Sequence, residues 1–281
     1  MSTSSGLEKA LLGVLFMVLA FGLQVHQVWC GEPGSSSSSF RFVQITDTHL
    51  GSSESFNRLA RVVRRINELP YPVACVVHSG DVFADSIADP AIRKQGLRIL
   101  DRLEPPLYAA PGNHDILRGD LEHTWRVWSH AFSKLVHTER VRGVRFVFAY
   151  TYPLTGSFHV PGYDPLARVE SALGSAKEGP VIVVHHAPSL PELADGARRG
   201  GWSGAESREW RRMLEQSGVI AVLAGHFHRS EQHWLGDVPL YVAPPVASSP
   251  GKGTFRVYEY SDGKLSYRAV RVPTPETATD E

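Results

Sequence analysis

Short apolar segments alternate with amphipathic segments along most of this chain. Six apolar, β-rich runs read as strands, at residues 41–46, 73–77, 107–110, 144–150, 181–184 and 219–224. Apolar residues at helical spacing predict five helices, over about 57–69, from 90, around 121–132, over 166–176 and from 203. Strands that alternate with helices predict an α/β core of packed layers.

Five of these predicted strands end in polar clusters rich in His, Asp and Asn. The clusters are Asp47-Thr48-His49, His78-Ser79-Gly80-Asp81, Gly112-Asn113-His114-Asp115, His185-His186 and Gly225-His226-Phe227-His228. Open α/β sheets place functional residues just beyond the carboxyl ends of their strands. We therefore expect these clusters, although far apart in the sequence, to meet at one site.

The last cluster holds two histidines one residue apart. In an extended segment, residues i and i+2 point to the same side, so a bend after Gly225 would aim His226 and His228 at one small volume. Histidine is the commonest metal ligand, because its neutral ring offers a free nitrogen. The pair predicts a metal site, and a polar turn that happens to hold two histidines is the alternative.

The N-terminal region has the pattern of a targeting segment. Leu11 to Leu23 is apolar and follows Lys9, and it is short for a membrane span. We interpret residues 1–30 as a secretory signal peptide, with an uncleaved membrane anchor as the alternative. Residues 31–39 read as a Ser-rich linker, 40–272 as one folded domain and 273–281 as a disordered tail. A secreted, periplasmic or membrane-anchored protein that faces outside the cytoplasm is expected.

The composition narrows the classes of partner. Lys and Arg number 29 and Asp and Glu number 29, so charge gives no reason to expect a nucleic acid polymer or an anionic membrane as partner. The two cysteines, Cys30 and Cys75, do not make a disulfide framework. Cys75 lies in an apolar run and is expected in the core. Lipidation of Cys30 fits poorly, because Trp29 precedes it.

Taken in order, the polar clusters resemble those of the calcineurin-like metallophosphoesterase superfamily. The matching motifs are Asp47-x-His49, Gly80-Asp81, Gly112-Asn113-His114-Asp115, His185 and Gly225-His226-x-His228. Each is weak alone, but five in the family's order are specific. The resemblance implies a metallophosphoesterase domain at 40–272. It further implies a layered α/β/β/α sandwich with two central mixed β-sheets and a metal site at the carboxyl ends of the strands.

The resemblance also implies a site for two metal ions. One ion would be held by Asp47, His49, Asp81 and His228, and the other by Asp81, Asn113, His185 and His226. Mixed nitrogen and oxygen ligands suit Mn, Fe, Zn or Co and do not select among them. Two metals suit phosphate ester hydrolysis, since they supply a hydroxide and offset charge on the phosphoryl oxygens.

Residues near the ligands receive supporting roles. By resemblance, His114 protonates the leaving oxygen or stabilises its charge, and Asp115 orients His114. A histidine simply satisfied inside its loop is the alternative for His114. His186 would point away from His185 in an extended segment, which favours a structural role for His186. Asp85 is a candidate to buttress the loop that carries Asp81.

The predicted activity is that of a binuclear metal-dependent phosphoesterase. A metal-bridging hydroxide would attack a phosphodiester or phosphomonoester in line, and the motifs resemble those of cyclic-nucleotide-type phosphodiesterases. No tyrosine stands next to Asp81, which argues against a purple acid phosphatase. The expected substrate is a small phosphate ester such as a nucleotide, selected by loops 151–164 and 188–202. A catalytically inactive binding or scaffold protein of the same fold is the alternative.

Overall fold

Two β-sheets form the centre of the computed structural model, which describes residues 39–156, 159–174, 179–190, 202, 204–247 and 253–273. The first sheet has the order β11 (Lys264–Arg271), β10 (Thr254–Ser261), β1 (Phe40–Ile45), β2 (Val76–His78) and β3 (Leu107–Ala109). The second has the order β4 (Val136–Val141), β5 (Val144–Ala149), β6 (Val181–Val184), β7 (Val219–Ala224), β9 (Val238–Val242) and β8 (Glu231–Leu235).

Both sheets are mixed. Strands β1, β2 and β3 are parallel, as are β5, β6, β7 and β9. The antiparallel strands β10, β11, β4 and β8 complete the two sheets. Parallel neighbours bring the carboxyl ends of β1, β2 and β3 to one edge, and those of β6 and β7 to one edge of the other sheet. This arrangement is what the site requires.

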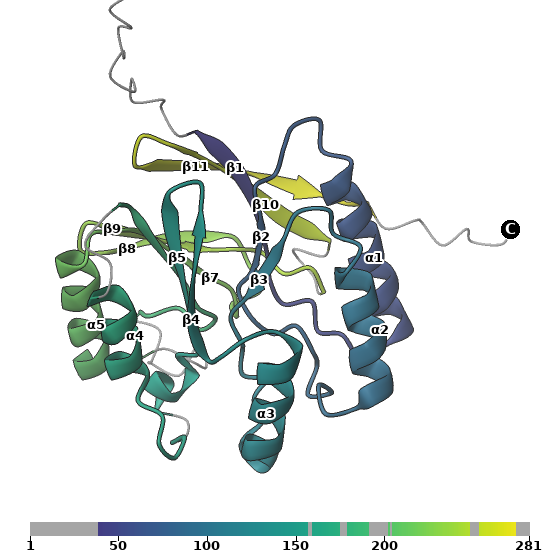
Figure 1. Cartoon of the computed structure of the whole chain (residues 1–281), viewed down its shortest axis with the longest axis horizontal. Coiled ribbons are helices and arrows are strands. Elements are labelled where there is room, and N and C mark those ends of the chain that lie inside the picture. Colours follow the sequence, from purple (N-terminus) through teal and green to yellow (C-terminus); the bar gives the residue numbers. More distant parts are fainter. Residues whose placement is uncertain are drawn as a thin grey trace, which may run out of the picture. The chain divides into compact units, whose positions relative to one another are not determined.

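Helices cover the outer faces of the sheets (Figure 1). The described helices are α1 (Ser53–Asn67), α2 (Pro90–Leu100), α3 (Leu121–Ala131), α4 (Pro165–Gly174) and α5 (Gly204–Gln216), with short 3-10 turns η1 (Arg118–Asp120) and η2 (Tyr152–Thr155). The helices α1 and α2 lie against the first sheet, and α4 and α5 against the second. The predicted α/β/β/α sandwich is confirmed.

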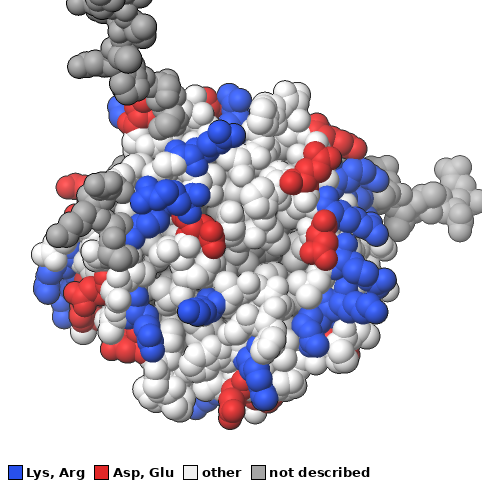
Figure 2. All heavy atoms as spheres, in the orientation of Figure 1, with Lys and Arg blue, Asp and Glu red and all other residues white. Residues whose placement is uncertain are grey.

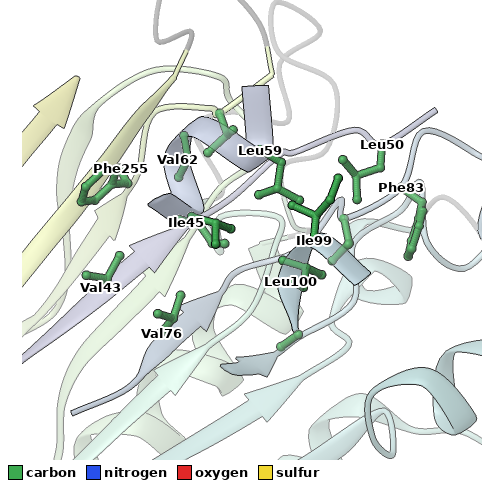
Figure 3. Packing of buried hydrophobic residues seen from close by; sticks show 14 of the residues in the cluster. Val43, Ile45, Leu50, Leu59, Val62, Val76, Phe83, Ile99, Leu100 and Phe255 are labelled. Atoms are coloured by element: carbon green, nitrogen blue, oxygen red, sulfur yellow. The ribbon is translucent and has the colours of Figure 1, made fainter. Parts of the chain in front are cut away.

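The core has three layers because side chains alternate along each strand. In β1, Val43 and Ile45 pack under the helices, where Figure 3 shows them with Leu59 and Val62 of α1. Phe42 points the other way and meets Phe146 of the second sheet, with ring centroids 5.2 Å apart. The space between the sheets is therefore filled by side chains from both.

Local signals set most element ends. Asp89 caps α2 by accepting hydrogen bonds from Ala91 N and Ile92 N, with Pro90 in the first turn as predicted. The helix α1 begins earlier than predicted because Ser52 caps it and accepts a bond from Ser55 N. Strand β2 begins at Val76 and is shorter than the predicted run.

Strand β4 was not predicted, because its sequence VHTERV has four consecutive polar residues between two valines and no clear apolar alternation. It forms a hairpin with β5 through Arg142 and Gly143, whose φ angles of 49° and 85° suit a tight two-residue turn. Asp262 and Gly263 make the corresponding turn between β10 and β11. The strands after residue 230 thus form two hairpins, β8 with β9 and β10 with β11.

Several sequence predictions fall outside the described residues. These are the leader at 1–30, nearly all of the linker at 31–39, all but the first residue of the tail at 273–281, and Ser203, where the last predicted helix begins. Parts of the two predicted specificity loops, 157–158 and 191–201, also lie outside them. Within the described residues, no helix is both long enough and apolar enough to span a membrane.

Candidate metal centre

The residues that follow β1, β2 and β7 have an unusual backbone conformation. Eight non-glycine residues among those described have positive φ, and six belong to these strand ends: Asp47, His49, Asp81, Asp85, His226 and His228. Positive φ is costly for residues with a side chain and persists where the surroundings enforce it, often at functional sites. The ligand histidines predicted on an extended backbone are instead delivered by left-handed turns.

One group of candidate ligands consists of Asp47, His49 and His228. Asp47 Oδ1 lies 3.1 Å from His228 Nε2 and 3.7 Å from His49 Nε2. The two histidine Nε2 atoms are 3.2 Å apart. Ligand atoms bound at about 2.0–2.2 Å around one ion lie roughly 3–3.5 Å from each other. The spacing of this group fits a single transition-metal ion.

A second group consists of Asp81, His186 and His226, whose ligand atoms lie within 4.8 Å of one another. His186 Nε2 is 2.9 Å from Asp81 Oδ2. The same Asp81 oxygen is 3.8 Å from His49 Nε2 of the first group. Asp81 therefore faces both groups, which fits the predicted role of a carboxylate shared by two ions.

Asn113 Oδ1 is buried and has no hydrogen-bond partner among the described residues, and Asp47 Oδ1 and His186 Nε2 are buried and face only other candidate ligands. Buried polar atoms are nearly always partnered. Asn113 stands between Gly112 and His114, both of which contact Asp81. Cations would supply the missing partners, so the donor set fits two metal ions.

The second oxygen of each central carboxylate is held by the protein. Asp47 Oδ2 accepts hydrogen bonds from Thr46 Oγ1 at 2.7 Å and from His226 N at 3.1 Å. Asp81 Oδ1 accepts one from His114 N at 2.9 Å. These bonds turn Asp47 Oδ1 and Asp81 Oδ2 toward the centre, as outer hydrogen bonds do in metal sites.

His186 is oriented in the same way. Its Nδ1 donates to the carbonyl of Ser79 at 2.8 Å, so the bare nitrogen of the neutral ring is Nε2. That nitrogen faces Asp81.

Two glycines allow backbone to approach these carboxylates. A Cβ at Gly225 would lie 2.6 Å from Asp47 Oδ2, and a Cβ at Gly112 would overlap Asp81 Oδ1. Real side chains do not reach such distances, so both positions require glycine for space. The motif glycines Gly112 and Gly225 thus let the backbone pack directly against the two central carboxylates.

The charges of the cluster are mutually dependent. Burial would raise the pKa of Asp47, but His186, His228 and His49 hold it well below its usual value. Burial would lower the pKa of His186, yet the charges of Asp81 and Asp47 raise it to about 9. Both central carboxylates are ionised at neutral pH, and in the protein without metal a histidine proton offsets their charge. Metal binding would displace that proton.

The prediction that His185 is the ligand and His186 structural is wrong on the placement of the two rings. The ring of His185 lies among aromatic side chains, 5.6 Å from Trp202 and 5.4 Å from Trp210. Burial lowers the pKa of His185 to about 3, so it is neutral. His185 continues the alternation of Val183, which faces the helices that cover this sheet. His186 takes the opposite side and enters the cluster.

The predicted partner of His114 is also corrected. His114 Nδ1 lies 2.9 Å from Asp85 Oδ1, and the His114 ring is 5.0 Å from that of His49. Asp115 points elsewhere: its carboxylate accepts hydrogen bonds from the backbone N–H groups of Val82, Phe83 and Gly112. Asp115 therefore connects the loop after β2 to the loop after β3 through hydrogen bonds. Burial and the nearby Asp81 raise its pKa to about 7.

His78 is a further buried histidine, next to the loops that carry Asp47 and Asp81. Its Nε2 lies 3.0 Å from Thr48 Oγ1, and its Nδ1 accepts a hydrogen bond from Gly80 N at 3.2 Å. It ends β2, as predicted. His78 ties together the two loops that follow β1 and β2, and burial lowers its pKa to about 3.

Comparison with known proteins gives three findings. The family model for calcineurin-like phosphoesterases matches residues 40–230, a range that contains every candidate ligand. A Danio rerio protein named "Transmembrane protein with metallophosphoesterase domain" is 25% identical over 80% of this chain and 47% of its own length. A Mycobacterium tuberculosis protein named "cAMP/cGMP dual specificity phosphodiesterase" is 27% identical over 72% of this chain and 65% of its own length.

The chain therefore spans less than two thirds of either of these curated relatives. Among solved structures, a dimetal phosphatase from Danio rerio has a TM-score of 0.59 at 15% identity. The alignment covers 83% of this chain and 98% of that one. At this identity the likeness shows a shared fold.

Proposed function

The chain belongs to the family of calcineurin-like phosphoesterases, and from this premise we propose that it hydrolyses phosphate esters with two transition-metal ions. The observation that carries the proposal is the position of Asp81, whose carboxylate faces both groups of candidate ligands. A single metal site would not need a carboxylate placed between two sets of histidines.

We base the ligand assignment on the motif order and on the positions of the Asp and His side chains, and we include Asn113 for its motif and its buried Oδ1. One ion would be held by Asp47, His49, Asp81 and His228, and the other by Asp81, Asn113, His186 and His226. When bound, two such ions would supply a hydroxide at neutral pH and offset the charge of the phosphoryl oxygens. The nitrogen and oxygen donors suit Mn, Fe, Zn or Co.

His114 is the proposed proton donor to the leaving oxygen. Its ring lies beside the cluster and is partly open to solvent, and Asp85 holds its Nδ1. Nε2 is then the nitrogen that faces a substrate. A nucleophile that attacks phosphorus in line, from the side of the metals, would leave the departing oxygen within reach of this ring.

The proposed substrates are small phosphodiesters, with nucleotides such as cyclic mononucleotides first. The curated relative from Mycobacterium tuberculosis carries that activity in its name, and the motifs of this chain resemble that branch. Figure 2 shows acidic and basic side chains intermixed on the face viewed, with several basic ones on the side of α1 and α2. Phosphomonoesters are the second candidate class, since the same ligand set serves both.

We also propose an extracytoplasmic location. The apolar block Leu11 to Leu23 supports a secretory signal or a membrane anchor. The N-terminal sequence of the protein purified from its own cells tests this, because cleavage near residues 22–30 gives a new N-terminus. An intact Met1 in a soluble cytosolic fraction would exclude both forms.

The direct experiment is a paired metal and activity measurement. The purified protein is loaded with Mn²⁺, its metal content determined, and its activity measured on bis-p-nitrophenyl phosphate, p-nitrophenyl phosphate and a panel of cyclic nucleotides. We expect about two ions per chain, turnover of the diester and loss of both in Asp81→Ala. Folded protein that binds no metal would support the alternative of a scaffold protein. Two bound ions without turnover of any of these esters would also refute the proposed activity.

A further inference from the structure

The layer between the two sheets contains a buried chain of polar side chains that ends next to the loops of the candidate ligands. Gln44 of β1 and Arg256 of β10 are paired across the strands, and both are fully buried, as is Tyr258. Their surroundings are aromatic and aliphatic side chains, for example Phe42, whose ring stacks on Tyr258 at 5.0 Å. Polar groups in such a layer are costly unless every member is hydrogen-bonded.

The three side chains form one continuous path. Arg256 Nη1 donates to Tyr258 OH at 3.2 Å, and Tyr258 OH donates to Gln44 Oε1 at 2.9 Å. Gln44 Nε2 then donates to Ser79 Oγ at 2.8 Å and to the carbonyl of Ala224 at 3.0 Å. The path therefore starts on β10, crosses β1 and reaches the ends of β2 and β7, which belong to different sheets.

The direction of these bonds follows from the chemistry of the guanidinium group. Arginine donates and cannot accept, so the Tyr258 hydroxyl must accept from it and use its own proton on Gln44 Oε1. The Gln44 amide is then fixed with its NH₂ group toward Ser79 and Ala224. The Ala224 carbonyl, which can only accept, requires the same orientation of the Gln44 amide.

Both ends of the path lie next to candidate ligands. Ser79 stands two residues before Asp81, and its carbonyl accepts the Nδ1 proton of His186. Ala224 stands two residues before His226. Asp81, His186 and His226 are the three residues of the second ligand group.

Arg256 reaches the adjoining loop as well. Its Nη2 donates to Ser230 Oγ at 2.6 Å, two residues after His228. Among the described residues Arg256 has no carboxylate partner; its charge is met by the Ser230 and Tyr258 hydroxyls, the Glu231 carbonyl and the face of the Tyr267 ring at 4.1 Å. Burying a cation without a carboxylate partner costs desolvation energy, so Arg256 is not expected to stabilise the fold more than an apolar residue of its size would.

We propose that Gln44, Tyr258 and Arg256 are positioning residues that fix the end of β2 against the end of β7 and thereby set the affinity of the second metal site. The inference rests on the proposed function, because it requires a site for two ions. It assigns these side chains to the spacing between the Asp81 loop and the His226 loop, and not to contact with metal or substrate.

Tyr258→Phe tests this with a change of one oxygen atom. The variant removes the acceptor of Arg256 Nη1 and the donor to Gln44 Oε1, so the Gln44 amide is held only through its Nε2. Tyr163→Phe is the matched control, since Tyr163 OH is also buried and donates to the carbonyl of Tyr150 at 2.6 Å, apart from the path. Gln44→Met is the second test variant, with similar length and no amide.

The measurement is calorimetric titration of the metal-free proteins with Mn²⁺, together with denaturant unfolding. We expect Tyr258→Phe and Gln44→Met to weaken one of the two binding events, the one that His186→Ala abolishes, about tenfold or more, the range for loss of an outer hydrogen bond in a metal site. The other event should weaken by less than about threefold. Tyr163→Phe should lose comparable stability and change neither event.

Three results would overturn the inference. Test variants that lose stability but bind both ions like the control would show that the path is only structural. Equal weakening of both events would remove its link to the second site. Wild-type protein that binds fewer than two ions would refute the proposed function itself, and the inference with it.

Discussion

At the end of β6, His185 and His186 are adjacent in sequence and face different surroundings. His186 Nε2 lies 2.9 Å from Asp81, whereas His185 packs between Trp202 and Trp210. One is a candidate ligand and the other fills the aromatic core under the helices. Single substitutions should separate these two roles.

His186→Ala should lose the second metal ion and nearly all activity, because it removes a candidate ligand of the second group. His185→Ala should keep both ions and instead lose roughly 1–3 kcal/mol of unfolding free energy, since it opens a cavity beside the tryptophans. Metal analysis and denaturant unfolding of the two variants check this. Loss of metal in His185→Ala alone would restore the ligand assignment made from the sequence.

Asp85→Asn should lower turnover by about tenfold or more, because general acid catalysis contributes about 10²–10⁴ and depends on the orientation of the acid. The loss should be larger for a cyclic nucleotide, whose leaving alkoxide needs a proton, than for an ester that releases p-nitrophenolate. Steady-state rates on both substrates give the comparison.

Asp115→Asn is the contrasting change. Asp115 accepts three backbone hydrogen bonds, and an amide would turn its NH₂ group toward some of these donors. We expect a loss of about 1–3 kcal/mol in unfolding free energy and little change in the ratio of the two rates. A substrate-dependent rate loss in Asp115→Asn and none in Asp85→Asn would reverse the two assignments.

The sequence was sufficient to find most residues of the site and insufficient to orient some of them. Motif order identified Asp47, Asp81 and Asn113, because residue type and position after a strand carry that information. The sequence could not tell which of the two residues after β6, His185 or His186, faces the site. Val181 to Val184 are apolar on both faces, and a fully buried strand has no polar side. Asp85 was missed as the partner of His114 because a left-handed turn, with φ of 57°, brings it there.

At the scale of elements, the carboxyl end of β7 is packed against the end of β1. Gly225 provides the contact, since a Cβ there would lie 2.6 Å from Asp47 Oδ2. Gly225→Ala should therefore displace Asp47 or the His226 turn, and weaken metal binding strongly in a protein that still folds.

The control for this change is Gly119→Ala, where an added Cβ meets no atom within 4 Å among those described. Metal content and circular dichroism of both variants are the measurements. Full metal content in Gly225→Ala would contradict the close approach of the two strand ends.

Element prediction succeeded where capping and burial patterns were strong. The Asp89-Pro90 start of α2 and the run Val219 to Ala224 of β7 are examples. It failed at β4, whose four central residues are polar and which lies at a sheet edge, held by pairing with β5. Pairing partners come from tertiary structure, which a local pattern does not encode.

For the whole molecule, metal binding should appear as stability. Asp47 and Asp81 are buried carboxylates at the candidate metal site, and ions that bind only the folded state shift unfolding by mass action. Free Mn²⁺ at a hundred times its dissociation constant should add about 2.7 kcal/mol per site, and chelation should remove it. Thermal unfolding with Mn²⁺, with Mg²⁺ as a weaker comparison, and with a chelator tests this. An unchanged midpoint would contradict a metal centre in the core.

Acid should destabilise the fold, because histidines that are neutral in the folded state take up protons on unfolding. His137 on β4 is an example outside the candidate metal site. Burial lowers its pKa from 6.5 to about 4, and its ring stacks on Phe148 at 4.8 Å. The unfolded chain therefore takes up a proton first as pH falls. Stability from this group is complete above pH 6.5 and is lost between pH 6.5 and 4, by roughly 1–3 kcal/mol.

His137→Phe should keep the stacking and flatten this part of the pH profile relative to wild type. Denaturant midpoints at pH 7.5, 6, 5 and 4 provide the measurement. Parallel profiles for the two proteins would show that His137 is protonated in the native state as easily as in the unfolded one.

The position of β1 has a consequence for how the protein is made. β1 pairs with β2 on one side and with β10, more than 200 residues later, on the other. Once the ribosome has added residue 228, all the candidate ligands have been synthesised. Strand β1, which leads to Asp47, still has an unpaired edge at that point. That edge closes only when β10 has been synthesised and has left the exit tunnel, so a chain that ends shortly after residue 228 should be a poor acceptor for metal.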